Sequence, residues 1–127
     1  MNNVTGQLWV GDFEDSRTFG GEVLCVYKPP ELKFQRMSWC LEIGYDQHKL
    51  PEQLDKIADL ITDRLAAGRA LLVYCGAGVE QSPLACAWWL WKTGRWPSFA
   101  HAYDHLKAIR PNVIDRTGWF ELGIVGG

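Results

Sequence analysis

The sequence predicts an α/β fold, a three-layer sandwich in which helices flank a mostly parallel central sheet. Short apolar segments bounded by Gly and Pro alternate with segments whose apolar residues recur at helical spacing. The segment ALLVYC (70–75) has the unbroken apolar character of a strand that is covered on both faces. A length of 127 residues fits a single domain over 1–127, so we expect one active site at most.

Three segments in the first third of the chain are candidate strands. QLWVGDF (7–13) indicates a short strand that ends at a Gly-Asp turn, and EVLCVYK (22–28) indicates a second, buried strand between glycine and proline pairs. SWCLEIGY (38–45) is the third candidate. We expect no helix between the first two strands, which would leave a site beside them shallow or differently walled.

The rest of the chain predicts helices around the 70–75 strand. PEQLDKIADLITDRLAAG (51–68) gives the strongest helix signal, with proline in its first turn, apolar residues at helical spacing and Gly68 at its end. Further helices are expected from about Ser82, over 98–109 and over 117–123. Strands that alternate with helices favour a parallel sheet.

Composition and charge exclude several classes of protein. Hydrophobic residues make up 47% and charged residues 22%, which argues against disorder. A net charge of -2 argues against sequence-independent binding of nucleic acid. The start MNNVTGQLWVGD lacks the pattern of a signal peptide, and no stretch of about 18 apolar residues predicts a membrane span. We expect a cytoplasmic monomer that has no membrane association, metal or cofactor.

The segment LLVYCGAGVEQSP (71–83) has the order strand, tight loop, helix. Such a loop directs several backbone N–H groups toward one point, where the helix dipole adds partial positive charge. The same field favours the thiolate of Cys75, which predicts a nucleophile. Gly76 and Gly78 allow a tight backbone, and Ser82 can cap the helix and donate a hydrogen bond to the sulfur.

YCGAGVEQSP resembles the signature loop of protein tyrosine phosphatases, especially the small dual-specificity phosphatases, in which Cys is followed by five residues, Arg, and Ser or Thr. LWVGDFED and AIRPNVIDRTGWFELG resemble the opening and closing segments of that family. The resemblance implies that Cys75 takes up the phosphoryl group of a phosphorylated protein or other phosphomonoester, through a phosphocysteine intermediate. It also implies that the loop binds phosphate, through Gly76, Ala77, Gly78, Val79, Glu80 and Gln81.

The resemblance further implies a general acid about thirty residues before the cysteine. Asp46 lies 29 residues before Cys75, just after the third candidate strand. A carboxylic acid there could protonate the oxygen of the leaving group. An aspartate in a loop also commonly serves as a turn or cap residue, so the spacing alone leaves both interpretations open.

Two positions depart from the pattern of the family. Tyr74 stands where histidine usually precedes the nucleophile, and Gln81 stands where arginine is expected. Arginine holds two phosphoryl oxygens with a charged, planar fork, whereas glutamine offers one uncharged NH₂ group. Loss of one oxyanion donor costs about 10² to 10³ in rate, and catalytic arginines contribute roughly 10³ to 10⁵. We therefore expect severely impaired hydrolysis.

Three functions remain open on this sequence. The first is a cysteine-dependent phosphatase crippled at Gln81, either as a natural pseudophosphatase or through an engineered replacement. The second is a non-catalytic module that binds phosphorylated protein. The third, a rhodanese-like sulfurtransferase, would leave Asp46 and Ser82 without a role.

Several other residues have plainer interpretations. We expect the tryptophans of CAWWLWKTGRW (86–96) to pack in the core, although an exposed Trp89 or Trp96 would offer a surface to a partner. Cys86 fits a small buried residue better than a disulfide partner of Cys75. Arg110 could help to bind an acidic substrate, but the resemblance of its segment to the closing segment of the family implies a mainly structural role. We expect Glu80 to be solvated and slightly unfavourable to polyanions.

Overall fold

The computed structural model describes residues 1–30, 36–44, 46 and 48–120. At its centre is a sheet with the strand order β1-β2-β5-β3-β4. The strands are β1 (Asn2–Thr5), β2 (Leu8–Gly11), β3 (Glu22–Cys25), β4 (Trp39–Cys40) and β5 (Leu71–Tyr74). All neighbours pair in parallel except β1, which pairs antiparallel with β2 at one edge. The predicted, mostly parallel α/β sheet is confirmed.

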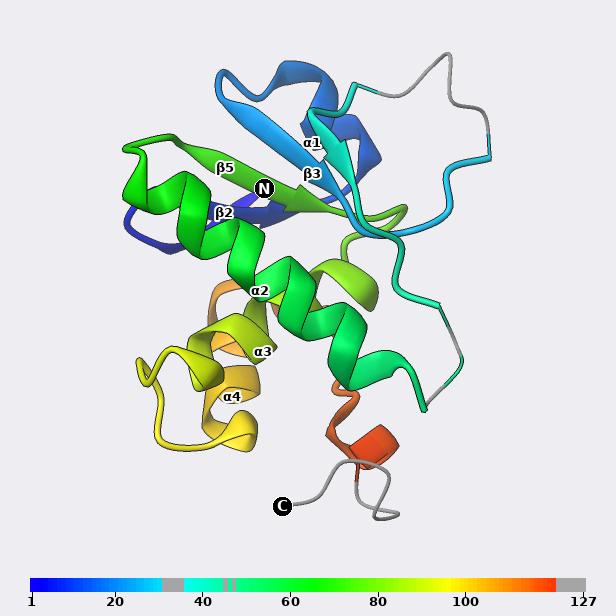
Figure 1. Cartoon of the computed structure of the whole chain (residues 1–127), viewed down its shortest axis with the longest axis vertical. Coiled ribbons are helices and arrows are strands. Elements are labelled where there is room, and N and C mark those ends of the chain that lie inside the picture. Colours follow the sequence, from blue (N-terminus) through cyan, green and yellow to red (C-terminus); the bar gives the residue numbers. More distant parts are fainter. Residues whose placement is uncertain (31–35, 45, 47, 121–127) are drawn as a thin grey trace.

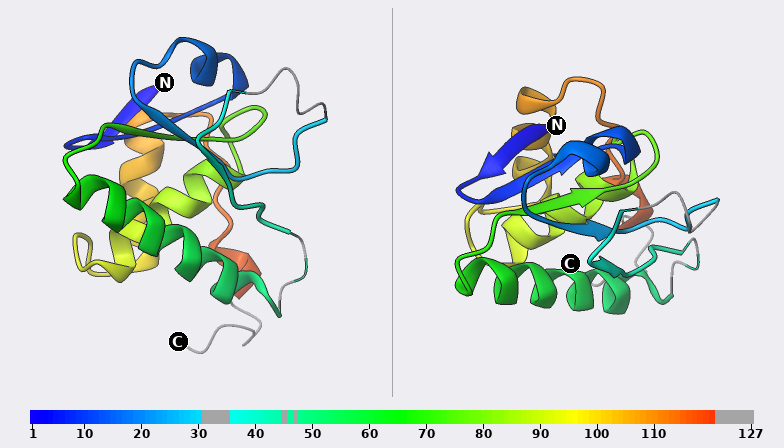
Figure 2. Two further views of the ribbon diagram at one scale, coloured as in Figure 1. Left: turned by 45° about the horizontal axis from the view of Figure 1, so that its top comes forward. Right: turned by 90° about the horizontal axis from the view of Figure 1, so that it is seen from above.

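Helices cover both faces of this sheet. They are α1 (Phe13–Thr18), α2 (Leu50–Ala66), α3 (Gln81–Lys92) and α4 (Phe99–Ile109), followed by a 3₁₀ helix, η2 (Thr117–Phe120). Figure 1 shows α2, α3 and α4 on one side of the sheet and the short α1 on the other, and Figure 2 shows this layering from two further directions. None of the described helices is long and apolar enough to cross a membrane.

The central strand β5 is buried on both faces, as its apolar sequence predicts. Leu71 and Val73 belong to the larger core under α2, α3 and α4. Leu72 and Tyr74 belong to a smaller cluster on the other face, with Val23 of β3. Alternation of side chains along a strand explains this division. The following residue, Cys75, is therefore directed to the side of the larger helices, where it joins their core.

The expectation that no helix separates the first two predicted strands is wrong. Helix α1 lies between β2 and β3, and a capping box starts it: the Asp12 side chain accepts from the Asp15 N–H at 2.9 Å, and the Asp15 carboxylate accepts from the Asp12 N–H at 3.0 Å. Six residues are too few to show a hydrophobic period, so reciprocal capping defines this helix. The helix buries Ser16 completely against the sheet.

Other elements differ from expectation mainly in length. The third predicted strand is reduced to Trp39–Cys40, and its last residue, at 45, lies outside the described residues. The last predicted helix is a 3₁₀ turn over Thr117–Phe120, and positions 121–123 also lie outside the described residues. Strand β1 was not predicted. The helices predicted over 51–68 and 98–109 are found as α2 and α4.

Helix α3 is buried along most of its length, which confirms the core role of its tryptophans. Trp88 and Trp89 are each 1% exposed. Trp89 is therefore no exposed surface for a partner, and its indole donates to the hydroxyl of Thr62 in α2 at 3.0 Å. Trp96 is partly buried against the same core.

Candidate active site

Residues 75–82, here called the cysteine loop, connect the carboxyl end of β5 to the first turn of α3. Cys75 follows the last residue of the strand, is 1% exposed, and donates its N–H to the Gly11 carbonyl at 3.4 Å. The loop ends as α3 begins at Gln81, with the carbonyl of Glu80 accepting from the Leu84 N–H at 3.1 Å. A thiol thus lies at the amino end of a buried helix, where the dipole favours negative charge.

The sulfur of Cys75 is part of a short hydrogen-bonded relay. Its Sγ lies 3.2 Å from Ser82 Oγ, which donates to the Gly11 carbonyl at 3.1 Å. Since a carbonyl can only accept, the single hydroxyl proton is directed to Gly11, and the neutral thiol then donates to Ser82. If the thiol ionises, the hydroxyl can turn its proton toward the sulfur. The predicted contact between Cys75 and Ser82 is present in the structure, with the neutral thiol as donor. The predicted helix cap is wrong, because the N-cap of α3 is Glu80, without a side-chain cap hydrogen bond, and Ser82 lies within the first turn.

Backbone donors hold two loop carbonyls from outside. The Phe13 N–H, at the start of α1, donates to Gly76 O at 3.2 Å. The Ile114 N–H donates to Val79 O at 2.8 Å. The missed helix α1 and the segment after α4 therefore brace the loop from two sides.

Arg110 holds the two carbonyls between them. Its Nε donates to Gly78 O at 2.7 Å and its Nη2 to Ala77 O at 3.3 Å, while its Nη1 donates to Asn2 Oδ1 at 2.9 Å. The guanidinium therefore fastens the loop to β1 at the start of the chain. The expected structural role of Arg110 agrees with these contacts.

This bracing determines where the amide hydrogens of the loop are directed. In a planar trans peptide the C=O of one residue and the N–H of the next are directed to opposite sides. With the carbonyls of residues 76–79 all engaged from outside, the amides of residues 77–80 are directed to the other side. Those amides donate to no carbonyl or side chain of the described residues. A set of neighbouring, unengaged N–H groups forms a concavity that suits an anion.

Gly78 is essential to this conformation. Its φ is +70°, a region that other residues rarely adopt. A Cβ atom there would lie 2.6 Å from Arg110 Nη2 and 2.8 Å from the backbone of Gly11. The loop thus requires glycine both for its turn and for its close packing.

The end of the loop carries a charged pair. Glu80 Oε2 lies 3.2 Å from Arg116 Nη2, and the Arg116 guanidinium lies 5.0 Å from the centre of the Trp119 ring. Glu80 was expected to be solvated, but its side chain is only 22% exposed. Arg116 was not singled out from the sequence, because no local pattern relates it to the loop.

Asp46 lies at the approach to α2. It is exposed; its Oδ1 accepts from the His48 N–H at 3.0 Å and its carbonyl accepts from the Lys49 N–H at 3.0 Å. These are the contacts of a turn residue. No hydrogen bond joins Asp46 to the described residues of the loop, so its role as general acid remains a prediction.

Tyr74 lies on the other face of the sheet from Cys75. Its ring is completely buried, its hydroxyl donates to the Arg36 carbonyl at 3.0 Å, and it makes an edge contact with Tyr27. Burial raises its pKa well above the usual tyrosine range. Tyr74 therefore contributes packing beneath the strand.

Cys86 lies in α3, beyond the loop, and is fully buried. Burial raises the pKa of this thiol, and the proximity of Cys75 raises it further. This matches the expected small core residue. Among the described residues, no three His, Cys, Asp or Glu side chains are grouped as metal ligands.

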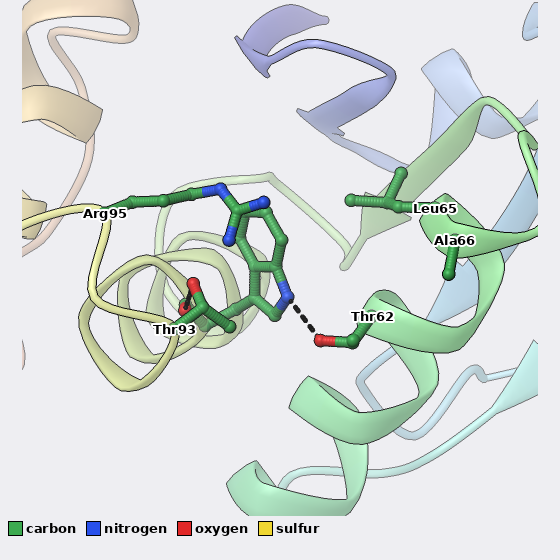
Figure 3. Close-up of a pocket in the computed structure, with 6 residues that line it drawn as sticks. Thr62, Leu65, Ala66, Thr93 and Arg95 are labelled. Atoms are coloured by element: carbon green, nitrogen blue, oxygen red, sulfur yellow. Dashed lines mark hydrogen bonds between the residues drawn. The ribbon is translucent and has the colours of Figure 1, made fainter.

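A cleft of about 440 Å³ lies at the other end of α3, between its last turn and that of α2 (Figure 3). Its lining is Thr62, Leu65, Ala66, Trp89, Thr93 and Arg95. The Arg95 guanidinium lies 4.2 Å from the centre of the Trp89 ring. The stretch of α3 from Gln81 to Trp89 separates the loop from the cleft by roughly 12 Å along the helix.

No protein-family model matches the chain. Over 70 residues, or 55% of its length, the chain is 39% identical to human dual specificity protein phosphatase 12. The match spans only 20% of that larger protein.

Solved structures resemble the chain over nearly its whole length. Human DUSP28 superimposes with a TM-score of 0.71 at 21% identity, covering 95% of this chain and 91% of that one. PTPMT1 superimposes with a TM-score of 0.79 at 17% identity, covering 95% and 89%. At these identities the likeness establishes the fold, and it agrees with the fold that the sequence predicts.

Proposed function

We propose, on the premise that this chain is a dual-specificity-phosphatase-like member of the protein tyrosine phosphatase superfamily, that its cysteine loop binds the phosphoryl group of a phosphomonoester. The observation that supports this most is the bracing of four consecutive carbonyls from outside, in a loop whose first residue is a buried thiol. The amides on the opposite side can donate to the oxygens of a tetrahedral anion. The substrate class is a phosphotyrosine or phosphothreonine side chain.

The chemistry that this arrangement suits is transfer of the phosphoryl group to sulfur. The Cys75 thiolate attacks phosphorus, the bond from phosphorus to the ester oxygen breaks, and Asp46 protonates that oxygen. Water then releases phosphate from the phosphocysteine and regenerates the thiol. Ser82 stabilises the leaving thiolate in the second step, since its hydroxyl lies 3.2 Å from the sulfur.

Gln81 limits this reaction. Charge spreads over the equatorial oxygens in the transition state, and the fixed amides meet it without the cationic fork that arginine supplies. The expected rate is lower than that of an arginine enzyme by about 10² to 10⁵. Binding in the ground state depends more on the amides and the helix dipole, so it survives better than turnover.

This asymmetry favours one second candidate, a module that binds phosphorylated protein without hydrolysing it. Its supporting observation is that the loop has its bracing and its buried thiol yet carries an uncharged residue at position 81. Chemically, the two candidates differ only in whether the thiolate completes its attack.

Replacement of Gln81 by arginine tests the proposal. With an aryl phosphate as substrate, Gln81→Arg should raise kcat/KM by about 10² or more, and Cys75→Ser in that background should abolish the gain. Calorimetric titration of the unchanged protein with inorganic phosphate measures binding separately. If phosphate binds but arginine gives no gain in activity, only the binding module remains. If phosphate does not bind and arginine gives no gain, the proposed anion site is refuted.

The role of Asp46 has its own test in the Gln81→Arg background. Asp46→Asn should slow the hydrolysis of an alkyl phosphate far more than that of an aryl phosphate with an acidic phenol, because a good leaving group needs no proton. Asp104→Asn, an exposed aspartate of α4, is the control. Equal losses with both substrates would show that Asp46 acts only as a turn residue.

A further inference from the structure

The segment that follows α4 runs alongside the cysteine loop and contacts it residue by residue. Arg110 holds Gly78, Ile114 holds Val79, and Arg116 then reaches the side chain of Glu80. The first two contacts engage the backbone and orient amides. The third engages a charge, so it requires a separate explanation.

The Glu80 and Arg116 pair is half enclosed and held on one side by an aromatic ring. The two side chains are 22% and 28% exposed, with 3.2 Å between Oε2 and Nη2. The guanidinium also lies over Trp119, and its Nε is buried without an acceptor among the described residues. The arginine is thus fixed at the loop by packing as well as by charge.

An unpaired carboxylate at position 80 would repel an anionic ligand in the loop. Glu80 is the residue that precedes α3, so its charge lies at the end of the helix where the dipole attracts an anion. Partly enclosed charges interact more strongly than charges in open solvent. Among the described residues, Glu80 forms its ion pair with Arg116 and none with Arg110, whose guanidinium contacts the carbonyls of Ala77 and Gly78 and the side chain of Asn2 instead.

We infer that Arg116 is a positioning residue that neutralises Glu80 and thereby sets how much negative charge the cysteine loop accepts. The inference rests on the proposed function, since it concerns the charge of the ligand in that same site. Without Arg116, the loop would keep its backbone geometry but discriminate against dianions. With Glu80 removed as well, the discrimination would disappear.

Two tetrahedral oxyanions of nearly equal size separate charge from shape: tungstate carries two negative charges and perrhenate one. Affinities are measured by calorimetry at pH 8 for the unchanged protein, Arg116→Gln, Glu80→Gln and the double variant. Arg116→Gln should weaken tungstate about tenfold and perrhenate only about threefold, because the repulsion scales with ligand charge. The double variant should return both affinities to within about twofold of the unchanged protein.

Arg64→Gln is the matched control. Arg64 pairs with Glu22 at 2.9 Å, with side chains 22% and 24% exposed, at the opposite end of the strands from the loop. Arg64→Gln should change the affinity for neither tungstate nor perrhenate. Thermal unfolding checks that each variant is folded. A purely structural role of Arg116 would weaken both anions by the same factor.

Equal weakening, no weakening, or no recovery in the double variant would each overturn the inference while leaving the anion site intact. If the unchanged protein binds neither oxyanion, the proposed function and this inference fall together.

Discussion

The two ends of helix α3 differ in the groups that surround them. At the amino end, the cysteine loop offers backbone amides that outside contacts hold in place. At the carboxyl end, the cleft is lined by side chains, with the Arg95 guanidinium over Trp89. The helix dipole favours anions at the first end and cations at the second, where Lys92 and Arg95 already lie. One helix therefore gives only its amino end the field that a phosphoryl group needs.

The largest expected effect on stability comes from the carboxyl end. Trp89→Ala would remove a buried indole, its hydrogen bond to Thr62 and the stacking of Arg95, at a cost of about 3 to 5 kcal/mol in the free energy of unfolding. Affinity for tungstate should stay within about twofold, because the loop has its own braces. Denaturant unfolding and calorimetry check both. A parallel loss of affinity would show that the two ends are not independent.

A pair of glycines sharpens the comparison. Gly78→Ala would combine a strained φ of +70° with contacts of 2.6 to 2.8 Å, and we expect a loss of about 2 to 3 kcal/mol together with anion binding. Gly94→Ala, just beyond the carboxyl end, has a φ of +76° but open space around its Cβ. It should cost about 1 kcal/mol and leave binding unchanged. If both variants changed anion affinity equally, the special role of Gly78 in the loop would be contradicted.

Between its two ends, α3 buries the thiol of Cys86, and we expect this thiol to make the stability of the protein depend on alkaline pH. Cys86 has a pKa raised by burial above the ordinary 9.0 of a thiol. Above pH 9 the unfolded chain releases this proton while the folded chain retains it, so stability falls as pH rises, by up to about 1.4 kcal/mol per pH unit for this group. Cys86→Ala should make the slope of unfolding free energy between pH 9 and 11 shallower by that amount. An unchanged slope would mean that Cys86 ionises in the folded protein.

The smallest effect on stability is expected at the hydrogen bonds that join Cys75, Ser82 and Gly11. Ser82→Ala removes the hydroxyl between Cys75 and the Gly11 carbonyl, at a cost of about 1 kcal/mol, because the Cys75 N–H still donates to that carbonyl. Anion affinity should change little. In the Gln81→Arg background the second step of turnover should slow, so phosphocysteine should accumulate and be detectable by intact-protein mass spectrometry. Absence of any accumulation would exclude a role in that step.

Local pattern was enough to predict the elements that long segments encode. Helix α2 follows from its apolar spacing and its first-turn proline, and β5 follows from its unbroken apolar run. Helix α1 could not be found in that way, because a reciprocal cap at Asp12 and Asp15 defines it within six residues. The cysteine loop was recognisable from its glycines and its place between strand and helix.

The braces of the loop were beyond sequence reasoning for a different reason. Phe13 and Arg116 meet the loop only after the chain has folded, and each contact joins residues far apart in sequence. Arg110 could be singled out because its segment resembles the closing segment of the family, but its three hydrogen-bond acceptors could not be predicted from the sequence. Asp46 could be singled out by its spacing of 29 residues from Cys75, yet spacing does not show whether its carboxylate reaches the site.

The bond from Arg110 to Asn2 joins residues near the two extremes of the described chain. During synthesis, β5 and the start of α3 are made before residues 110–116, so the loop peptides have no Arg110 guanidinium to orient them until that later segment folds back. Contacts of such long sequence separation form late, after their loop-closure entropy has been overcome. The proposed anion site is therefore expected to mature as one of the last events of folding.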